Sequence, residues 1–183
     1  MVGSQKKIME RVLYEYEFNW GEYASNFILL ALGIGFLSIA LSVIKEQKHD
    51  ENMRGFSVVL LKVLGFTVGP FAILLFLGLT ELAVRQYFEY KDLLETENIY
   101  SVMGYVENFH PMPYEGHDTE HFEVDGVYFE YSDYITTNGY NTAASHGGVV
   151  TRNGQHLKIK YIVEEYESGK IKNIILYIAE ITE

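Results

Sequence analysis

The sequence predicts an integral membrane protein of mixed α and β class. We expect a two-helix transmembrane hairpin followed by a small, mostly antiparallel, five-stranded β barrel of the OB-like or SH3-like kind. Three observations predict this architecture. Two long apolar runs lie within the first 82 residues, the net acidic charge is confined to the rest, and apolar and polar residues alternate from about residue 99. Alternation with a period of two is typical of β-strands.

The net charge of −11 is unevenly distributed along the 183 residues. Acids and bases balance at seven each through Thr80, and residues 92–151 hold eleven acids with no lysine or arginine. Such a surface repels nucleic-acid phosphates and anionic lipid headgroups, so we expect no nucleic-acid partner. The chain contains no cysteine, which excludes disulfides, thiolate nucleophiles and cysteine-based metal sites.

The first apolar run, residues 26–44, is uncharged for nineteen residues. At about 1.5 Å per helical residue this length matches a hydrocarbon core of about 30 Å. No basic region directly precedes the run and no small-residue cleavage site follows it, so it predicts a transmembrane helix rather than a signal peptide. The second span covers residues 57–82, where Lys62 is expected to extend its ammonium toward the headgroups. The uncharged parts of the two spans, residues 26–44 and 63–80, contain no acid or histidine that would indicate an ion path.

Small residues at helical spacing predict how the two helices pack. They let backbones approach closely in lipid. In an antiparallel pair Gly65 and Gly69 would lie near Ser42 and Ser38. We favour packing within one chain, with a homo-oligomer as the alternative. The predicted packing residues are Ala31, Gly35, Ser38 and Ser42 on the first helix and Gly65, Gly69 and Ala72 on the second.

The flanking segments complete the membrane half. Ile8, Val12, Tyr16 and Trp20 recur every four residues, which predicts an amphipathic helix at the bilayer interface. The basic residues are slightly more numerous in the loop between the spans, so the positive-inside rule places that loop in the cytoplasm and the β domain outside. The expected segments are an interfacial segment (1–25), a first helix (26–44), a polar loop (45–56), a second helix (57–82), a helical linker (83–98) and an acidic β domain (99–183).

The strongest local signal in the β domain is the stretch "HFEVDGVYFEY". A two-residue Asp-Gly loop suits a type I′ turn between two strands. This turn pairs Val124 with Val127 and Phe122 with Phe129 on one face. Alternation in "SVMGYVENF" and "HLKIKYIVEEY" predicts two further strands. The stretch "IKNIILYIAEI", which is too apolar to assign a face, is the fifth.

The stretch "GYVENFHPMPYEGHDTEHFEVDGVYFEYSDY", followed by "SHGG" and "GQHLKIKYI", resembles a family of uncharacterised bacterial proteins with membrane-attached small β-barrel domains. The resemblance covers roughly residues 101–163, about a third of the chain. It implies a bacterial source and a discrete module. It implies no reaction, because no activity is known for that family.

A divalent-metal site is one hypothesis for the base-free stretch. Its ligands would be His117, Asp118, Glu120 and His121, since imidazole and carboxylate groups suit Zn²⁺, Mn²⁺ or Ni²⁺. The prolines and glycine around these residues argue against a helix that would bring the two histidines together. We therefore favour an exposed polar loop here and expect no cofactor.

The long loop after the Asp-Gly hairpin is the better candidate for recognition. Tyr134, Tyr140, Asn141 and His146 offer rings, an amide and an imidazole to a ligand or partner. The alternative is that these side chains pack within their own loop. Ser132, Asp133, Ser145 and His146 contain the atoms of a hydrolase triad, but no nucleophile-elbow motif accompanies them.

The sequence thus predicts a non-enzymatic, membrane-anchored interaction or binding module in the cytoplasmic membrane. We expect the lipid bilayer as its environment, a membrane or envelope protein as its partner, and membership of a larger membrane complex. The alternative is an envelope-facing sensor of a small ligand or metal. A hydrolytic enzyme is the least supported interpretation.

Overall fold

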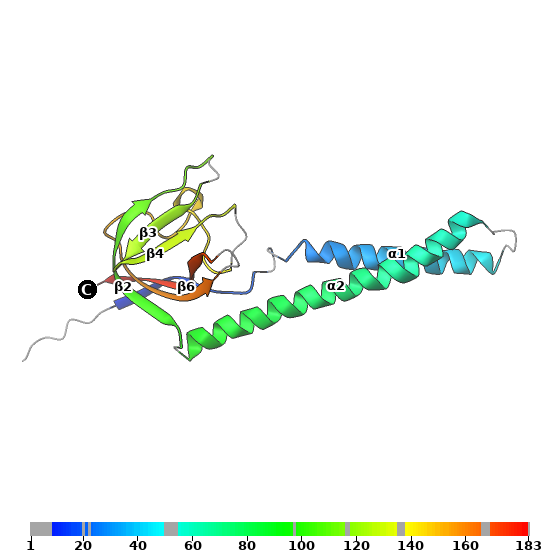
Figure 1. The fold of residues 1–183 in the computed structure, drawn as a ribbon, viewed down its shortest axis with the longest axis horizontal. Coiled ribbons are helices and arrows are strands. Elements are labelled where there is room, and N and C mark those ends of the chain that lie inside the picture. Colours follow the sequence, from blue (N-terminus) through cyan, green and yellow to red (C-terminus); the bar gives the residue numbers. More distant parts are fainter. Residues whose placement is uncertain are drawn as a thin grey trace, which may run out of the picture. The chain divides into compact units, whose positions relative to one another are not determined.

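The computed structural model describes residues 9–19, 21, 23–49, 55–96, 98–115, 118–134, 138–165 and 169–182. The chain forms two compact units. One is helical and comprises Phe18–Phe88, whereas the other is a β domain built from the chain before Phe18 and after Phe88. The helical unit is therefore an insertion between the first and second strands of the β domain (Figure 1).

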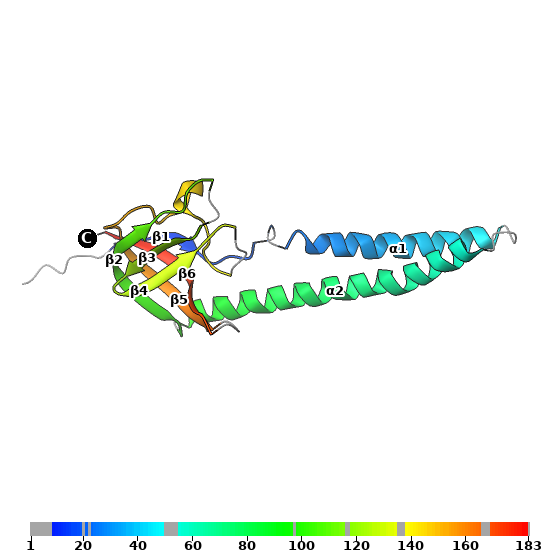
Figure 2. The same cartoon turned by 45° about the horizontal axis from the view of Figure 1, so that its top comes forward.

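The helical unit contains α1, Asn26–Gln47, and most of α2, Phe56–Glu95. Both helices are long and apolar enough to cross a membrane. The predicted linker is helical through Glu95 and continuous with the second span, so α2 has 40 residues (Figure 2). At 1.5 Å per residue α2 is about 60 Å long, roughly twice the thickness of a hydrocarbon core.

The face of α2 that contacts α1 is the predicted one. Gly65, Gly69 and Ala72 are buried. A Cβ on Gly65 would lie 2.6 Å from the Phe36 carbonyl oxygen and would overlap the Ala40 side chain. A Cβ on Gly69 would lie 3.1 Å from the Gly33 carbonyl oxygen. The two backbones are therefore in direct contact.

For α1, the prediction of which face contacts α2 is wrong. Gly33 and Ala40 are buried against α2, whereas Gly35 has nothing within 4 Å of its Cβ position. At 100° per residue, Gly35 lies about 200° around the helix from Gly33. Small residues occupy both sides of α1, and spacing alone did not identify the side that meets the glycines of α2. The other predicted contacts, Ala31, Ser38 and Ser42, are exposed in the structure.

The β domain is a single antiparallel sheet of six strands in the order β1-β6-β5-β2-β3-β4, and it is open rather than a closed barrel. The expectation of five strands and a barrel is therefore corrected. Figure 2 labels the strands of this sheet. Their bounds are Met9–Glu15 for β1, Tyr100–His110 for β2, Glu120–Val124 for β3, Val127–Tyr131 for β4, His156–Glu165 for β5 and Ile171–Thr182 for β6.

The additional strand is β1, which replaces part of the amphipathic helix expected in residues 1–25. It pairs with β6, with Glu10 opposite Ile181 and Arg11 opposite Glu180. A spacing of four residues fits a strand as well as a helix, because four is an even number of residues and keeps side chains on one face of a strand. The helical interpretation was therefore wrong for Met9–Glu15, while Ile8 and Trp20 lie outside the described residues.

The Asp-Gly hairpin is confirmed. Phe122 lies opposite Phe129 and Val124 opposite Val127. Asp125 and Gly126 both have positive φ, 48° and 76°, as a type I′ turn requires.

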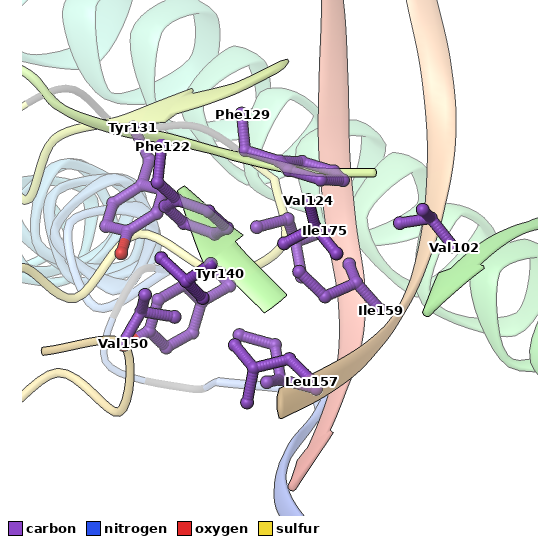
Figure 3. Packing of buried hydrophobic residues seen from close by; sticks show 12 residues of the cluster. Val102, Phe122, Val124, Phe129, Tyr131, Tyr140, Val150, Leu157, Ile159 and Ile175 are labelled. Carbon is purple, nitrogen blue, oxygen red and sulfur yellow. The ribbon is translucent and has the colours of Figure 1, made fainter. Parts of the chain in front are cut away.

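The interior of the β domain is filled by large apolar side chains from five strands and the long loop. Figure 3 shows Tyr131, Tyr140 and Val150 beside Phe122, while Val102 lies at the other end of the cluster. The buried cluster comprises Val102, Val106, Phe122, Val124, Phe129, Tyr131, Tyr140, Val150, Leu157, Ile159, Ile175 and Ile178.

The last residues of α2, from Glu89 on, belong to the same compact unit as the strands and contact them through their side chains. The Tyr90 hydroxyl donates to Glu164 Oε1 at 2.7 Å, and its ring lies 5.1 Å from that of Tyr16. Lys91 Nζ lies 2.6 Å from Glu15 Oε1. The two chain segments that lead into the helical unit therefore leave the β domain side by side.

Candidate functional site

The candidate site is organised from inside by the carboxylate of Glu120. Glu120 is the first residue of β3 and is fully buried, with an exposed fraction of 0%. Its Oε1 accepts from the Tyr131 hydroxyl at 2.7 Å, and its Oε2 accepts from Ala144 N at 3.0 Å and from Met112 N at 3.4 Å. One buried carboxylate thus joins β3, β4, the segment after β2 and the long loop. These hydrogen bonds satisfy a buried polar group and fix the position of both loops relative to β3.

The sequence contained a signal for this role that the metal hypothesis overlooked. Glu120, Phe122 and Val124 alternate along the strand, so they share its inner face. The same alternation directs His121 to the outer face. Glu120 and His121, both predicted as metal ligands, therefore lie on opposite faces of the strand.

The other predicted metal ligands are not brought together either. His121 stacks on His110 across β2 and β3, with ring centroids 4.7 Å apart, and its Nδ1 is buried without a hydrogen-bond partner. Asp118 Oδ1 accepts from Thr119 N at 2.8 Å. His117 lies outside the described residues. Within the described ranges, no group of three or more histidines and acids could hold a metal ion.

Tyr140 belongs to the core rather than to an exposed recognition surface. It is 5% exposed, and its ring lies 5.0 Å from that of Tyr131 and 4.9 Å from that of Tyr14. Its hydroxyl accepts from Val149 N at 2.6 Å. Burial raises the pKa of Tyr140 to about 12 and raises that of Tyr131 further, so both hydroxyls stay protonated at neutral pH. For Tyr140, the structure therefore fits the alternative in which the loop packs on itself.

Four side chains on the loops held by Glu120 reach the surface, and we call them the loop surface. His146 Nδ1 lies 2.5 Å from Asp133 Oδ2, and the Tyr114 ring lies 4.7 Å from the imidazole. Tyr114 is 67% exposed and Tyr134 is 49% exposed. Tyr134 N donates to the buried hydroxyl of Ser132 at 3.3 Å. The loop surface thus consists of Tyr114, Asp133, Tyr134 and His146.

Sequence reasoning identified half of this surface. Tyr134 and His146 were predicted, whereas Tyr114 was missed because it lies in the separate segment after β2. Asp133 was considered only as a triad atom. Asn141 is partly buried, unlike the four exposed residues of the loop surface.

The arrangement around His146 is not a serine-hydrolase triad. Ser145 Oγ lies 3.5 Å from His146 Nδ1, the same ring nitrogen that Asp133 contacts. In a triad the serine and the carboxylate bind opposite nitrogens of the ring. With Asp133 at Nδ1, Nε2 is the ring nitrogen left to meet a ligand.

Comparison of the chain with protein-family models, with curated proteins and with solved structures gives no match. The case for a function therefore depends on the contacts, burial and charge described above.

Proposed function

We propose that the protein is a non-enzymatic, membrane-anchored interaction module that binds its partner through the loop surface. The observation that carries this proposal is the Glu120 centre. It fixes two separate loops from the interior, so an Asp133–His146 pair and exposed tyrosine rings are held in a defined arrangement at the surface. Recognition side chains that are ordered before binding lose less conformational freedom in the complex.

The attachment of the β domain to the helices supports an anchored role. Both connections to the helical unit leave the β domain at Tyr16 and Tyr90, whose rings are in contact. If the two helices span a bilayer, the β domain lies on one side of it and the connection between α1 and α2 on the other. Lys45, Lys48 and Arg54 near that connection favour its placement in the cytoplasm, with the β domain outside. A bound membrane or envelope protein would then make this chain a subunit of a larger complex.

Photocrosslinking in the native membrane tests the proposal. Benzoylphenylalanine replaces Tyr114 or Tyr134, and Tyr100 on β2, which is 62% exposed, is the matched control. We expect a discrete crosslinked protein from the first two positions and not from the third. The same crosslink should weaken by about tenfold in a His146→Ala background, because central interface residues carry most of the binding energy.

Two results would contradict this assignment. Equal crosslinking at all three positions would show that the loop surface is not selective. Absence of a crosslinked protein, with the β domain still folded, would overturn the interaction module and favour the small-ligand sensor.

Single-cysteine labelling tests the orientation, and the cysteine-free chain gives no background. Glu107→Cys lies on an exposed position of β2, and Gly55→Cys lies in the connection before α2, where a Cβ has open space. In intact cells a membrane-impermeant maleimide should label the cysteine at position 107 and not the one at position 55. The reverse pattern would place the β domain in the cytoplasm and direct the search to cytosolic partners.

A further inference from the structure

A small cavity lies where the sheet fails to close, between β4 and the start of β6. These strands are not neighbours in the hydrogen-bonded sheet, and two side-chain contacts join them instead. Asn173 Nδ2 donates to the Tyr128 carbonyl oxygen at 2.8 Å, and Lys170 Nζ lies 3.0 Å from Glu130 Oε2. The cavity has a volume of about 170 Å³ and is lined by Tyr128, Glu130, Lys170, Ile171, Lys172 and Asn173.

The side chains that line this cavity include two lysines and one carboxylate. Lys170 is bound to Glu130, so that carboxylate is already engaged. Burial alone would raise the pKa of Glu130, but hydrogen bonds from Lys170 and Thr119 hold that pKa below its usual range. Glu130 is therefore ionised at neutral pH, and the lining carries one more positive than negative charge.

Lys172 lacks the partner that its position in the sheet would provide. It is half-buried and lies directly opposite Glu164 on β5. However, Glu164 accepts the hydroxyl of Tyr90, and Glu130 and Glu164 attract the Lys172 ammonium without forming an ion pair with it among the described residues. Burial lowers the pKa of Lys172. A partly desolvated ammonium without a bound anion is unfavourable, and a ligand carrying negative charge would relieve this.

We propose that this cavity binds a small oxyanion, a carboxylate or phosphate group, with Lys172 as its charged contact and Lys170 as a second cation beside it. A water molecule occupies about 30 Å³ of liquid volume, so the cavity holds the equivalent of roughly five waters. Sites for drug-sized ligands occupy about 300–1,000 Å³. The occupant is therefore a small ion, or the terminal anionic group of a larger ligand.

Two carboxylates lie near this site, Glu130 in its lining and Glu164 opposite Lys172. Each already accepts a hydrogen bond, from Lys170 and from Tyr90 respectively. At physiological ionic strength charges farther away than about 8 Å are largely screened. Binding is expected to be weak, in the millimolar range, and to weaken further as salt is added.

The test uses the full chain in maltoside micelles and a buffer free of phosphate and carboxylate. Inorganic phosphate and acetate are titrated by calorimetry, and the melting temperature of the β domain is followed in parallel. An anion that joins β4 to β6 binds the folded state, so the melting temperature should rise with ligand concentration. The Lys172→Met variant should raise the Kd by about tenfold or more, which corresponds to about 1.4 kcal/mol.

Two matched variants distinguish binding in this cavity from nonspecific attraction of the anion by positive charge elsewhere on the β domain. Lys158→Met removes the same charge from β5, where Lys158 pairs with Glu10 at 3.2 Å, and should leave the Kd within about twofold because exposed pairs contribute little. Lys172→Arg keeps the charge and should retain binding. The proposal is overturned if neither anion binds saturably at about 10 mM, or if the two methionine variants weaken binding equally.

Adding short-chain phosphatidylglycerol to the micelles distinguishes the two sources of the anion. A lipid headgroup as occupant should compete with inorganic phosphate and raise its apparent Kd. A free ion as occupant should bind with the same Kd in both kinds of micelle. Either result supports an oxyanion site and identifies the class of occupant.

Discussion

The helical hairpin and the β domain hold their segments together in different ways. In the hairpin, Gly33, Gly65 and Gly69 let two backbones touch where a side chain would collide. In the β domain, large side chains fill the interior and one carboxylate, Glu120, joins β3 to three other segments. If the hairpin spans a bilayer, lipid offers no hydrophobic drive for helix association, and the fit between the two backbones matters most. Burial of apolar surface stabilises the β domain, and its buried polar centre selects one arrangement of the loops.

Removing the Glu120 carboxylate is expected to have the largest effect. Glu120→Ala would remove the acceptor of the buried Tyr131 hydroxyl and Met112 N–H and of the partly buried Ala144 N–H. Each unsatisfied group costs about 1–3 kcal/mol, so we expect a loss of roughly 3–5 kcal/mol in the free energy of unfolding of the β domain. Thermal unfolding followed by near-ultraviolet circular dichroism, which reports the packing of the tyrosines, measures this loss.

The matched control is Glu123→Ala, which removes the same carboxylate three positions along β3. Glu123 lies opposite Tyr128 on the outer face, so its loss should change the free energy of unfolding by no more than about 0.5 kcal/mol. Similar effects of the two substitutions would show that Glu120 does not organise the loops.

The parts of the fold that could be predicted from sequence depend on short-range signals. An uncharged run of nineteen residues identifies α1 by its length, and Asp125-Gly126 identifies the β3–β4 hairpin by the dihedral angles it requires. The strand β1 carries no such signal. Its pairing with β6 joins residues as distant as Arg11 and Glu180, and no local pattern indicates that these segments meet.

The candidate site was only partly predictable for a related reason. His146 and Tyr134 were identified by residue type, but their arrangement depends on a buried carboxylate that belongs to another strand. Tyr140 has the same residue type as Tyr134, yet it contacts Tyr14 and Tyr131 in the core. Whether a tyrosine in a long loop faces solvent or the interior is decided by strand order, which the sequence pattern did not contain.

The smaller effect is expected in the hairpin, where Gly65→Leu tests the backbone contact. The added side chain would collide with Phe36 and Ala40. Overpacking of this kind costs about 1–3 kcal/mol and should move the helices apart by on the order of 2 Å. Spin labels on single cysteines at Leu41 and Phe66, both exposed, would report the change as a longer interhelical distance in micelles.

Gly35→Leu is the control that also tests the alternative interpretation of the small residues on α1. Because Gly35 has open space around it, leucine at this position should leave the interhelical distance unchanged. Unequal effects of the two substitutions would support packing within one chain. If Gly35→Leu instead converted a dimer into a monomer, the exposed face of Ala31, Gly35, Ser38 and Ser42 would be a contact between copies. The glycines of α2 would then pack the two helices of one chain against each other. The four residues of α1 would instead join one copy of the chain to another.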